Sequence, residues 1–328
     1  MAVVKANAYG HGIVPAAMAL AGSDGFAVAR FAEAIALRVA GIRHRIVLLE
    51  GVQDAEELRE AAQHGFEPVV HELEQVALLE AWRGEHLFPA WLKIDTGMGR
   101  LGFRPEDLPA ALARLASCRS IVRPMALMTH LAEAEVRDGE RTRAQLECFN
   151  RATGGLPGER CISNSAGLCA WPAARADWVR PGLMLYGLSP FAGATGADLG
   201  LRPAMTLESR VIAVKELAAG DRVGYGGTWT APRATRIAVV SAGYGDGYPR
   251  NTAAGAPARV NGARVPLVGR VSMDMLTVDV TAVARVAVGD PVELWGPGIP
   301  VETVAAAAGT IPYELVCGVS ERVHIEVH

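Results

Sequence analysis

Short hydrophobic runs alternate with amphipathic helical stretches over roughly the first 190 residues. The runs are nearly continuously apolar and rich in β-branched residues, as is typical of strands covered on both faces. We expect strands at 2–7, 25–30, 46–51, 67–71, 90–95, 124–130, 159–164 and 178–186. Helical patterns lie between them at 31–41, 55–65, 72–84, 105–117, 138–153 and 166–176. Eight strands that alternate with helices predict an α/β fold, a (β/α)8 TIM-type barrel rather than an open sheet.

The pattern changes at 189–203, a segment rich in Gly, Ala and Pro that reads as a linker. Beyond it the helical periodicity nearly disappears. Strands are expected at 205–217, 234–243, 258–280 and 290–296, with Asn261-Gly262 as a hairpin signal. We therefore predict a barrel domain over 1–196 and a β-rich C-terminal domain over 197–328.

Composition excludes several classes of function. Half of the 328 residues are hydrophobic and the net charge is −3, so nothing favours nucleic acid or an anionic membrane as a partner. No apolar run reaches the roughly 20 residues that cross a bilayer, and the start lacks the features of a secretory signal. The five cysteines are scattered without a CxxC pair, which indicates neither a metal site nor a disulfide framework. A cytoplasmic protein is the simplest interpretation.

Lysine is almost absent. The chain has only Lys5, Lys93 and Lys215, and the other 29 of its 32 basic residues are arginine. Arginine stays protonated and cannot act as an amine nucleophile, so the remaining lysines are candidates for amine chemistry. For Lys215, which we place at a surface strand end, chance survival is the better interpretation.

Catalytic groups of such barrels gather at the carboxyl ends of the strands. Lys5 ends the first predicted strand and Lys93 the fifth, where burial lowers a lysine pKa and makes the amine a usable nucleophile. The alternative for Lys5 is a strand-end lysine that reaches water. Ser165, before a short helix and near the Gly182 and Leu183 amides, suits a phosphate, although a helix cap would use the same residue.

Seven strings then carry a resemblance to a known family. VVKANAYGHG, LKIDTGMGRLG, NSAG, RPGLMLYG, VGYGGTW, GYGDGYPR and GRVSMDM occur in this order and resemble the alanine racemase family over nearly the whole chain. The resemblance implies a barrel that binds pyridoxal 5'-phosphate (PLP), followed by a β domain. It also implies a head-to-tail homodimer in which each active site is completed by the partner subunit. The implied reaction is the interconversion of L- and D-alanine through a PLP Schiff base and two bases.

The resemblance assigns the catalytic residues. Lys5 would hold PLP and act as the base on the D-alanine face, and Tyr225 of the other subunit would act on the L-alanine face. Racemisation needs both because one base removes the Cα proton and the other returns it. His130 would assist Tyr225. Arg180 would stand behind that histidine and face the pyridine nitrogen; without the resemblance, a salt bridge at the barrel rim is the alternative.

The remaining assignments concern binding. Arg100 would support the cofactor oxygen and the substrate carboxylate, and Lys93 resembles a lysine that is often carbamylated and orients that arginine. Tyr9, Ser165 and Tyr313 resemble phosphate ligands, and Asn164, Gly182 and Leu183 complete the expected cofactor site. Met273 and Asp274 resemble a substrate loop from the partner, and Tyr244 would narrow the entrance. For the residues of the β domain, packing and turns are the alternative.

Family members usually carry a few dozen residues before the strand of the PLP lysine, so the short start puts barrel closure and domain contacts in question. Other interpretations stay open. The same barrel could serve a broad-specificity racemase or a decarboxylase, a lone barrel could be a PLP-homeostasis protein, and a shortened family member could be inactive. A biosynthetic enzyme that supplies D-alanine for peptidoglycan precursors and a catabolic enzyme fit the sequence equally.

Overall fold

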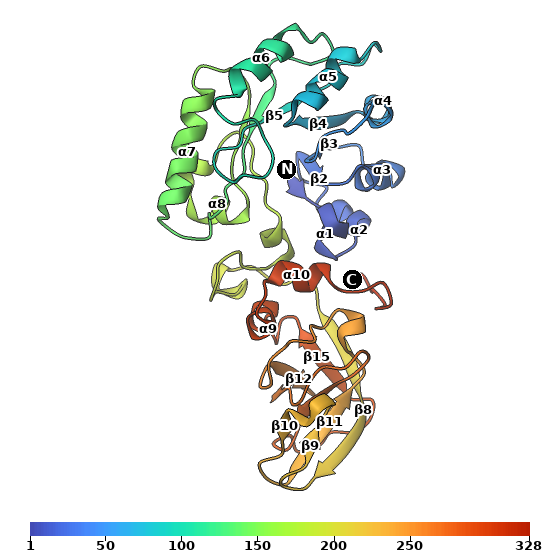
Figure 1. Ribbon diagram of the computed structural model, residues 1–328. Helices are drawn as coiled ribbons and strands as arrows, with labels where there is room; N and C mark the ends of the chain where they lie inside the picture. Colours follow the sequence, from blue (N-terminus) through green and yellow to red (C-terminus); the bar gives the residue numbers. More distant parts are fainter. The chain divides into compact units, whose positions relative to one another are not determined.

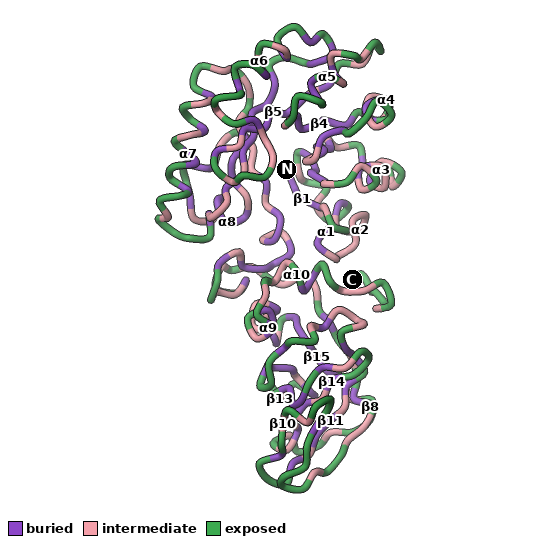
Figure 2. The backbone as a smooth tube through the Cα atoms, in the orientation of Figure 1, coloured by how far each residue is buried: buried purple, intermediate pink, exposed green.

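Parallel strands that pair in chain order from β1 to β7 form the first unit, Met1–Leu185 (Figure 1). The computed structural model describes every residue from 1 to 328. Most of these strands are buried along their whole length, as Figure 2 shows, in agreement with the predicted apolar runs. Their bounds are β1 Ala2–Val3, β2 Gly25–Val28, β3 Arg45–Leu48, β4 Phe66–Val70, β5 Trp91–Lys93, β6 Ala126–Met128 and β7 Arg160–Cys161.

Helices connect the strands and lie outside them (Figure 1). Helix α4 shows why they form where the sequence predicts. The Asp54 side chain accepts the Glu56 and Glu57 amides, Leu58 faces the core, and Gly65 ends the helix in a left-handed conformation. The bounds are α2 Ile13–Ala19, α3 Phe31–Val39, α4 Ala55–His64, α5 Leu73–Ala81, α6 Leu108–Ser117, α7 Glu140–Thr153 and α8 Ser165–Ala170.

The segment 178–181 takes the place of an eighth strand and closes the barrel. Trp178 forms a parallel bridge with Cys161, and the Arg180 amide donates to the Ser163 carbonyl at 3.0 Å. On the other side, the Val3 amide donates to the Pro181 carbonyl at 3.0 Å. The barrel predicted from the sequence is confirmed, and its closure, which the short start put in question, is complete.

Two local predictions were wrong, and one helix was missed. The strand expected at 2–7 stops at Val3, because Val4 with ψ 18° leaves the extended conformation and the chain then turns left-handed from Ala6. No regular strand forms at 178–186: the pairing is limited to 178–181, Pro181 has no amide to continue it, and η2 (Leu183–Tyr186) follows as a 3-10 turn. Helix α2 (Ile13–Ala19) was not expected at all.

The second unit, Tyr186–His328, is built on an antiparallel sheet in the order β13-β12-β15-β8-β11-β14. Leu267 bridges Val278, which joins the two edge strands. The predicted hairpin is confirmed: Asn261 and Gly262, both with positive φ, connect the paired strands β12 and β13. The bounds are β8 Leu207–Leu217, β11 Thr235–Val240, β12 Pro257–Val260, β13 Ala263–Pro266, β14 Leu276–Asp279 and β15 Pro291–Trp295, with the small pair β9 Arg222–Val223 and β10 Trp229–Thr230.

The prediction of an almost purely β second unit missed two helices, α9 (Val301–Ala308) and α10 (Pro312–Cys317). Half of helix α9 is alanine, which has high helix propensity but gives little contrast between apolar and polar faces. The expected division at 196/197 stays a prediction; it lies about ten residues beyond the start of the second unit at Tyr186. None of the helices combines the length and the apolar character that crossing a membrane requires.

Candidate active site

The carboxyl ends of the barrel strands bring five predicted basic residues together. Lys5 follows β1 and Lys93 ends β5, while Arg100 lies in the loop after β5 and His130 follows β6. Arg180 comes from the closing segment. The positive charges of Lys5, Arg100 and Arg180 all act on both Lys93 and His130. The ring order of the strands thus assembles one cluster from positions up to 175 residues apart in the printed sequence.

Burial and mutual repulsion lower the pKa of the two central groups. Lys93 is 7% exposed, and its pKa falls from 10.5 to about 8 because of burial first, then the charges of Arg180, Arg100 and Lys5. Asp95 is the one group that opposes this shift. The pKa of His130 falls well below 6.5 for the same reasons, so its imidazole is neutral at pH 7. A site with this excess of positive charge is suited to an anionic ligand.

Arg180 has no carboxylate partner. Its guanidinium donates to the Cys161 carbonyl at 3.0 Å and to the Thr129 carbonyl at 2.7 Å, and it contacts the Cys161 thiol at 2.9 Å. The salt bridge considered as an alternative from the sequence is therefore absent. Carbonyls of two strand ends fix the side chain, but they leave its positive charge uncompensated.

Arg180 also fixes the proton of His130. Its Nη2 lies 3.3 Å from His130 Nδ1. A guanidinium is always a donor, so Nδ1 must accept and the neutral ring carries its proton on Nε2. His130 is therefore prepared to donate from Nε2.

The loop that carries Arg100 is shaped by Asp95. The Asp95 Oδ1 atom accepts the amides of Gly97, Met98 and Gly99 at 2.9–3.1 Å. Backbone bonds between Asp95 and Phe103 and between Phe103 and Lys93 close the loop at its base. A narrow recess there is lined by Lys93, Ile94, Asp95, Met98, Arg100, Leu101, Thr129 and His130.

A second group of predicted residues forms a cradle of hydrogen-bond donors. Ser165, the first residue of α8, lies at 2.9 Å from the Gly182 amide and 3.4 Å from the Met184 amide, both of which donate to its Oγ. A Cβ at Gly182 would lie 2.4 Å from Tyr9 Oη, so glycine is what lets Tyr9 approach. Asn164 caps α8 by accepting the Gly167 amide, and Leu183 is fully buried beside the cradle. The hydroxyls of Ser165 and Tyr9 thus come together beside the Gly182 backbone, a grouping that suits an anion such as a phosphate.

The turn after Lys5 is strained. Ala6, Asn7, Ala8 and Tyr9 all have φ between 52° and 55°, a left-handed conformation that costs a non-glycine residue about 1–2 kcal/mol. The turn is held by several bonds, among them the Ile13 amide on Asn7 Oδ1 at 2.8 Å and the Ala6 amide on Glu33 Oε1 at 2.6 Å. Strain of this kind gathers at functional sites, and here it lies between Lys5 and Tyr9.

Sequence reasoning missed the residues that support the site. Gln145 of α7 donates to Thr96 Oγ1 and to the His130 carbonyl, and its Oε1 accepts the Ala132 amide at 2.8 Å. Thr96 and Thr129 hydroxyls pair at 2.9 Å beneath it. A glutamine on an amphipathic helix carries no sequence signal that it points inward. Glu33 and Cys161 were missed for similar reasons.

The other predicted residues form a separate group on the second unit. Tyr225 is 65% exposed, and the Arg250 guanidinium lies 5.9 Å from its ring centre and 5.6 Å from that of Tyr244. Met273 is exposed, and its carbonyl accepts the Gly245 amide next to Tyr244. Asp274 is ion-paired with Arg322 at 2.7 Å, and Tyr313 lies on α10. The structure thus assembles two groups, one on each unit.

Comparisons with known proteins cover both units. Residues 1–190 match the family model described as alanine racemase, N-terminal domain, and residues 204–327 match alanine racemase, C-terminal domain. The alanine racemase of Nitrosococcus oceani is 52% identical over 324 residues, which cover 98% of this chain and 90% of that protein.

Two solved structures agree with these matches. The biosynthetic alanine racemase of Pseudomonas aeruginosa superimposes with a TM-score of 0.95 at 47% identity, covering 98% of this chain and 90% of that one. The alanine racemase of Bartonella henselae with covalently bound pyridoxal phosphate gives a TM-score of 0.86 at 32% identity, with the same two coverages. This chain belongs to the alanine racemase family.

Proposed function

We propose that this chain interconverts L- and D-alanine, as an isomerase, with PLP held at Lys5 and two bases on opposite faces of the substrate. The observation that carries the proposal is the cluster of Lys5, Lys93, Arg100 and Arg180 around a neutral histidine, with Asp95 as the one carboxylate that acts on Lys93. Relatives at about half identity carry this activity in their names, and one solved relative holds covalent pyridoxal phosphate.

The residues of the barrel fit PLP. Tyr9, Ser165 and the amides around Gly182 and Leu183 would hold its phosphate, with Asn164 keeping α8 in position. Tyr313, which belongs to the second unit, is proposed as a further ligand. Arg180 would face the pyridine nitrogen, and Arg100 would support the ring oxygen and the alanine carboxylate. When bound, PLP supplies the electron withdrawal that makes the Cα proton of the amino acid acidic.

Lys5 and Tyr225 are the proposed bases. Lys5 would move the proton on the D-alanine face and the partner subunit's Tyr225 on the L-alanine face. A phenol has a pKa near 10 and needs help to act as a base. His130 can give this help, because Arg180 occupies its Nδ1 and leaves Nε2 as a donor. A donor at the phenol oxygen stabilises the phenolate.

Arg180 also explains a preference for racemisation. A guanidinium stays protonated and cannot readily give a proton to the pyridine nitrogen. Electron withdrawal is weaker as a result, and return of the proton to Cα is favoured over loss of the amino group. This is the specific reason to prefer a racemase over other reactions on the same barrel.

Lys93 is the proposed site of carbamylation. Only a neutral amine attacks carbon dioxide, and a pKa of about 8 leaves an appreciable neutral fraction at pH 7.5. The carbamate would bring a negative charge into a cluster of cations and would orient Arg100. Intact-mass analysis in bicarbonate tests this, and a free amine at Lys93 would contradict it.

A homodimer with shared sites is proposed from the second unit. Tyr225 and Met273 are large side chains left 65% and 53% exposed, beside Tyr244 and Arg250. A phenol in bulk water cannot act as a base within a dry site, so this surface needs a partner to cover it. The five cysteines form no disulfide, which favours a reducing compartment, and we place the enzyme in the cytoplasm.

The decisive experiment is chiral chromatography of the purified protein after incubation with L-alanine, with and without PLP, beside Lys5→Ala. D-alanine that appears only with intact Lys5 is the expected result. Serine and larger amino acids in parallel reactions test for broad specificity, and release of carbon dioxide tests for decarboxylation. PLP binding without D-alanine would move the chain to another PLP reaction, and no PLP binding would mean an inactive member.

A further inference from the structure

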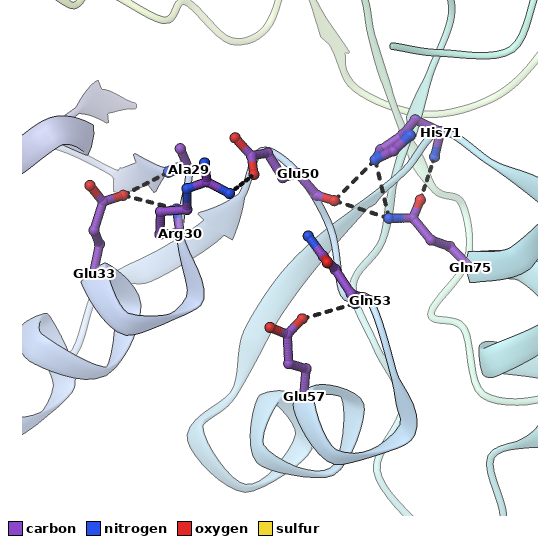
Figure 3. A network of polar contacts seen from close by, with 8 residues as sticks. All are labelled: Ala29, Arg30, Glu33, Glu50, Gln53, Glu57, His71 and Gln75. Carbon is purple, nitrogen blue, oxygen red and sulfur yellow. Dashed lines mark hydrogen bonds and ion pairs between the residues drawn. The ribbon is translucent and has the colours of Figure 1, made fainter.

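Glu33 joins the start of helix α3 to the left-handed turn that follows Lys5. It is the third residue of α3, and its Oε2 accepts the amides of Ala29 and Arg30 at 2.9 Å (Figure 3). Its other oxygen, Oε1, accepts the Ala6 amide at 2.6 Å. One carboxylate therefore serves three backbone donors on two segments.

The bond to Ala6 is placed where the turn needs support. Ala6 is the residue after Lys5 and the first of the four left-handed residues that end at Tyr9. Ala6 and Asn7 are exposed, so packing contributes little to holding them. A charge-assisted hydrogen bond is stronger than one between neutral groups, and it fixes the chain direction directly after the Lys5 side chain.

We propose that Glu33 is a positioning residue for the active site, which holds the strained turn between Lys5 and Tyr9 in its binding-competent form before the cofactor arrives. The expected effect on cofactor affinity rests on the proposed function. The expected effect on the order of the turn rests on the contacts alone.

Glu33→Gln separates this role from helix capping. A glutamine has one acceptor oxygen, and turning it toward Ala29 and Arg30 keeps two bonds, whereas turning it toward Ala6 keeps one. The variant should keep the helix cap and present its NH2 group to the Ala6 amide, so that two donors face each other. The turn loses its support while α3 stays capped.

Helix α4 offers a matched control. Glu57 is the third residue of α4, and its Oε2 accepts the Gln53 amide at 2.8 Å (Figure 3). Gln53 is the residue before the helix cap, so a glutamine at 57 can keep this single bond. Glu57→Gln removes the same charge from the equivalent position of the next helix, without touching the turn.

Hydrogen–deuterium exchange of the cofactor-free proteins is the first measurement. We expect residues 5–12 to exchange about ten-fold faster in Glu33→Gln than in wild type, with no change in Glu57→Gln and similar melting temperatures for both variants. The second measurement is the PLP dissociation constant, which should rise about ten-fold in Glu33→Gln alone. Equal exchange and equal affinity in the two variants would overturn the proposal and leave Glu33 as a helix cap.

Two further comparisons keep the test decisive. A glycine adopts a positive φ without strain, so Ala6→Gly added to Glu33→Gln should restore much of the PLP affinity. Should Glu33→Gln not fold alone, Glu33→Asp takes its place: it keeps the charge at the helix start, but its shorter side chain cannot serve both segments, and exchange in residues 5–12 equal to that of Glu57→Asp would refute the proposal. Should wild type bind no PLP, the proposed function fails, while the exchange data still decide the role of Glu33.

Discussion

At the scale of single residues, the main feature of the site is positive charge that is buried without a negative partner. Arg180 is fixed by carbonyl groups, which orient it without neutralising it. The cost falls on the neighbours that can lose a proton, and the pKa values of Lys93 and His130 are both lowered. An anionic cofactor and a carbamate would offset the repulsion among these cations. The free energy of unfolding of the cofactor-free protein should therefore be measurably lowered by it.

Lys93→Met should relieve that penalty. The folded-state pKa of about 8 lies below the ordinary 10.5, so the unfolded chain binds this proton more tightly than the folded chain. A difference of this size corresponds to about 3 kcal/mol. We expect Lys93→Met to raise the free energy of unfolding by up to that amount at pH 7, in cofactor-free protein kept free of carbon dioxide.

The pH dependence carries the sign of this effect. The penalty is complete below pH 8, and wild-type stability should gain from Lys93 as the pH rises from about 8 to about 10.5. That gain should be missing in Lys93→Met and unchanged in Lys215→Met, since Lys215 is exposed on β8. Denaturant titrations across this range measure the free energy of unfolding. The same pH dependence in wild type and Lys93→Met would disprove that burial of the charged Lys93 destabilises the fold.

At the scale of elements, two glutamines make the same kind of contact, each between a helix and the ends of two neighbouring strands. Gln75 of α5 donates to the Glu50 and Val52 carbonyls after β3 and accepts the His71 amide after β4, as Figure 3 shows in part. Gln145 of α7 makes the corresponding contacts after β5 and β6, on Thr96, His130 and Ala132. Each helix thus ties together the ends of two neighbouring strands, but only the second pair carries proposed catalytic groups.

Gln145→Leu and Gln75→Leu should therefore differ in activity but not in stability. Each leaves buried backbone groups without a partner, which costs about 1–3 kcal/mol per group, and urea denaturation should show similar losses. Turnover of alanine should fall about ten-fold or more in Gln145→Leu, because His130 and the loop of Arg100 lose their common support. A similar turnover in the two variants would show that Gln145 serves only the fold.

The same scale shows what the sequence could predict. Buried strands such as β4 and capped helices such as α4 follow from local pattern, and the rule for strand ends located Lys5, Lys93 and His130 correctly in one cluster. The left-handed turn could not be predicted, because alanine at positive φ is unfavourable locally and is held by Glu33, a contact 27 residues away. Gln145 was missed because its role depends on which strand ends are neighbours in the barrel. The pattern of hydrophobic and polar residues does not show this.

At the scale of the whole molecule, the question is whether the two groups of predicted residues in one active site come from the same subunit or from two. The barrel of one subunit carries Lys5 with its cation cluster, and the second unit carries Tyr225 on an exposed surface. Closed symmetric dimers are the most common assemblies, and their contacts occur twice. In the proposed dimer, each active site takes Lys5 from one subunit and Tyr225 from the other.

Complementation between two inactive variants tests this arrangement. Lys5→Ala and Tyr225→Phe homodimers should each be inactive or nearly so, because every site lacks one base. In a mixed dimer, one site lacks both bases and the other has both, provided that the sites are shared between subunits. Random reassociation after mild denaturation makes about half of the dimers mixed, so about a quarter of wild-type activity should return. If each site instead took both residues from one chain, every site in the mixture would still lack one base and no activity would return, whereas a wild-type sample carried through the same treatment would recover.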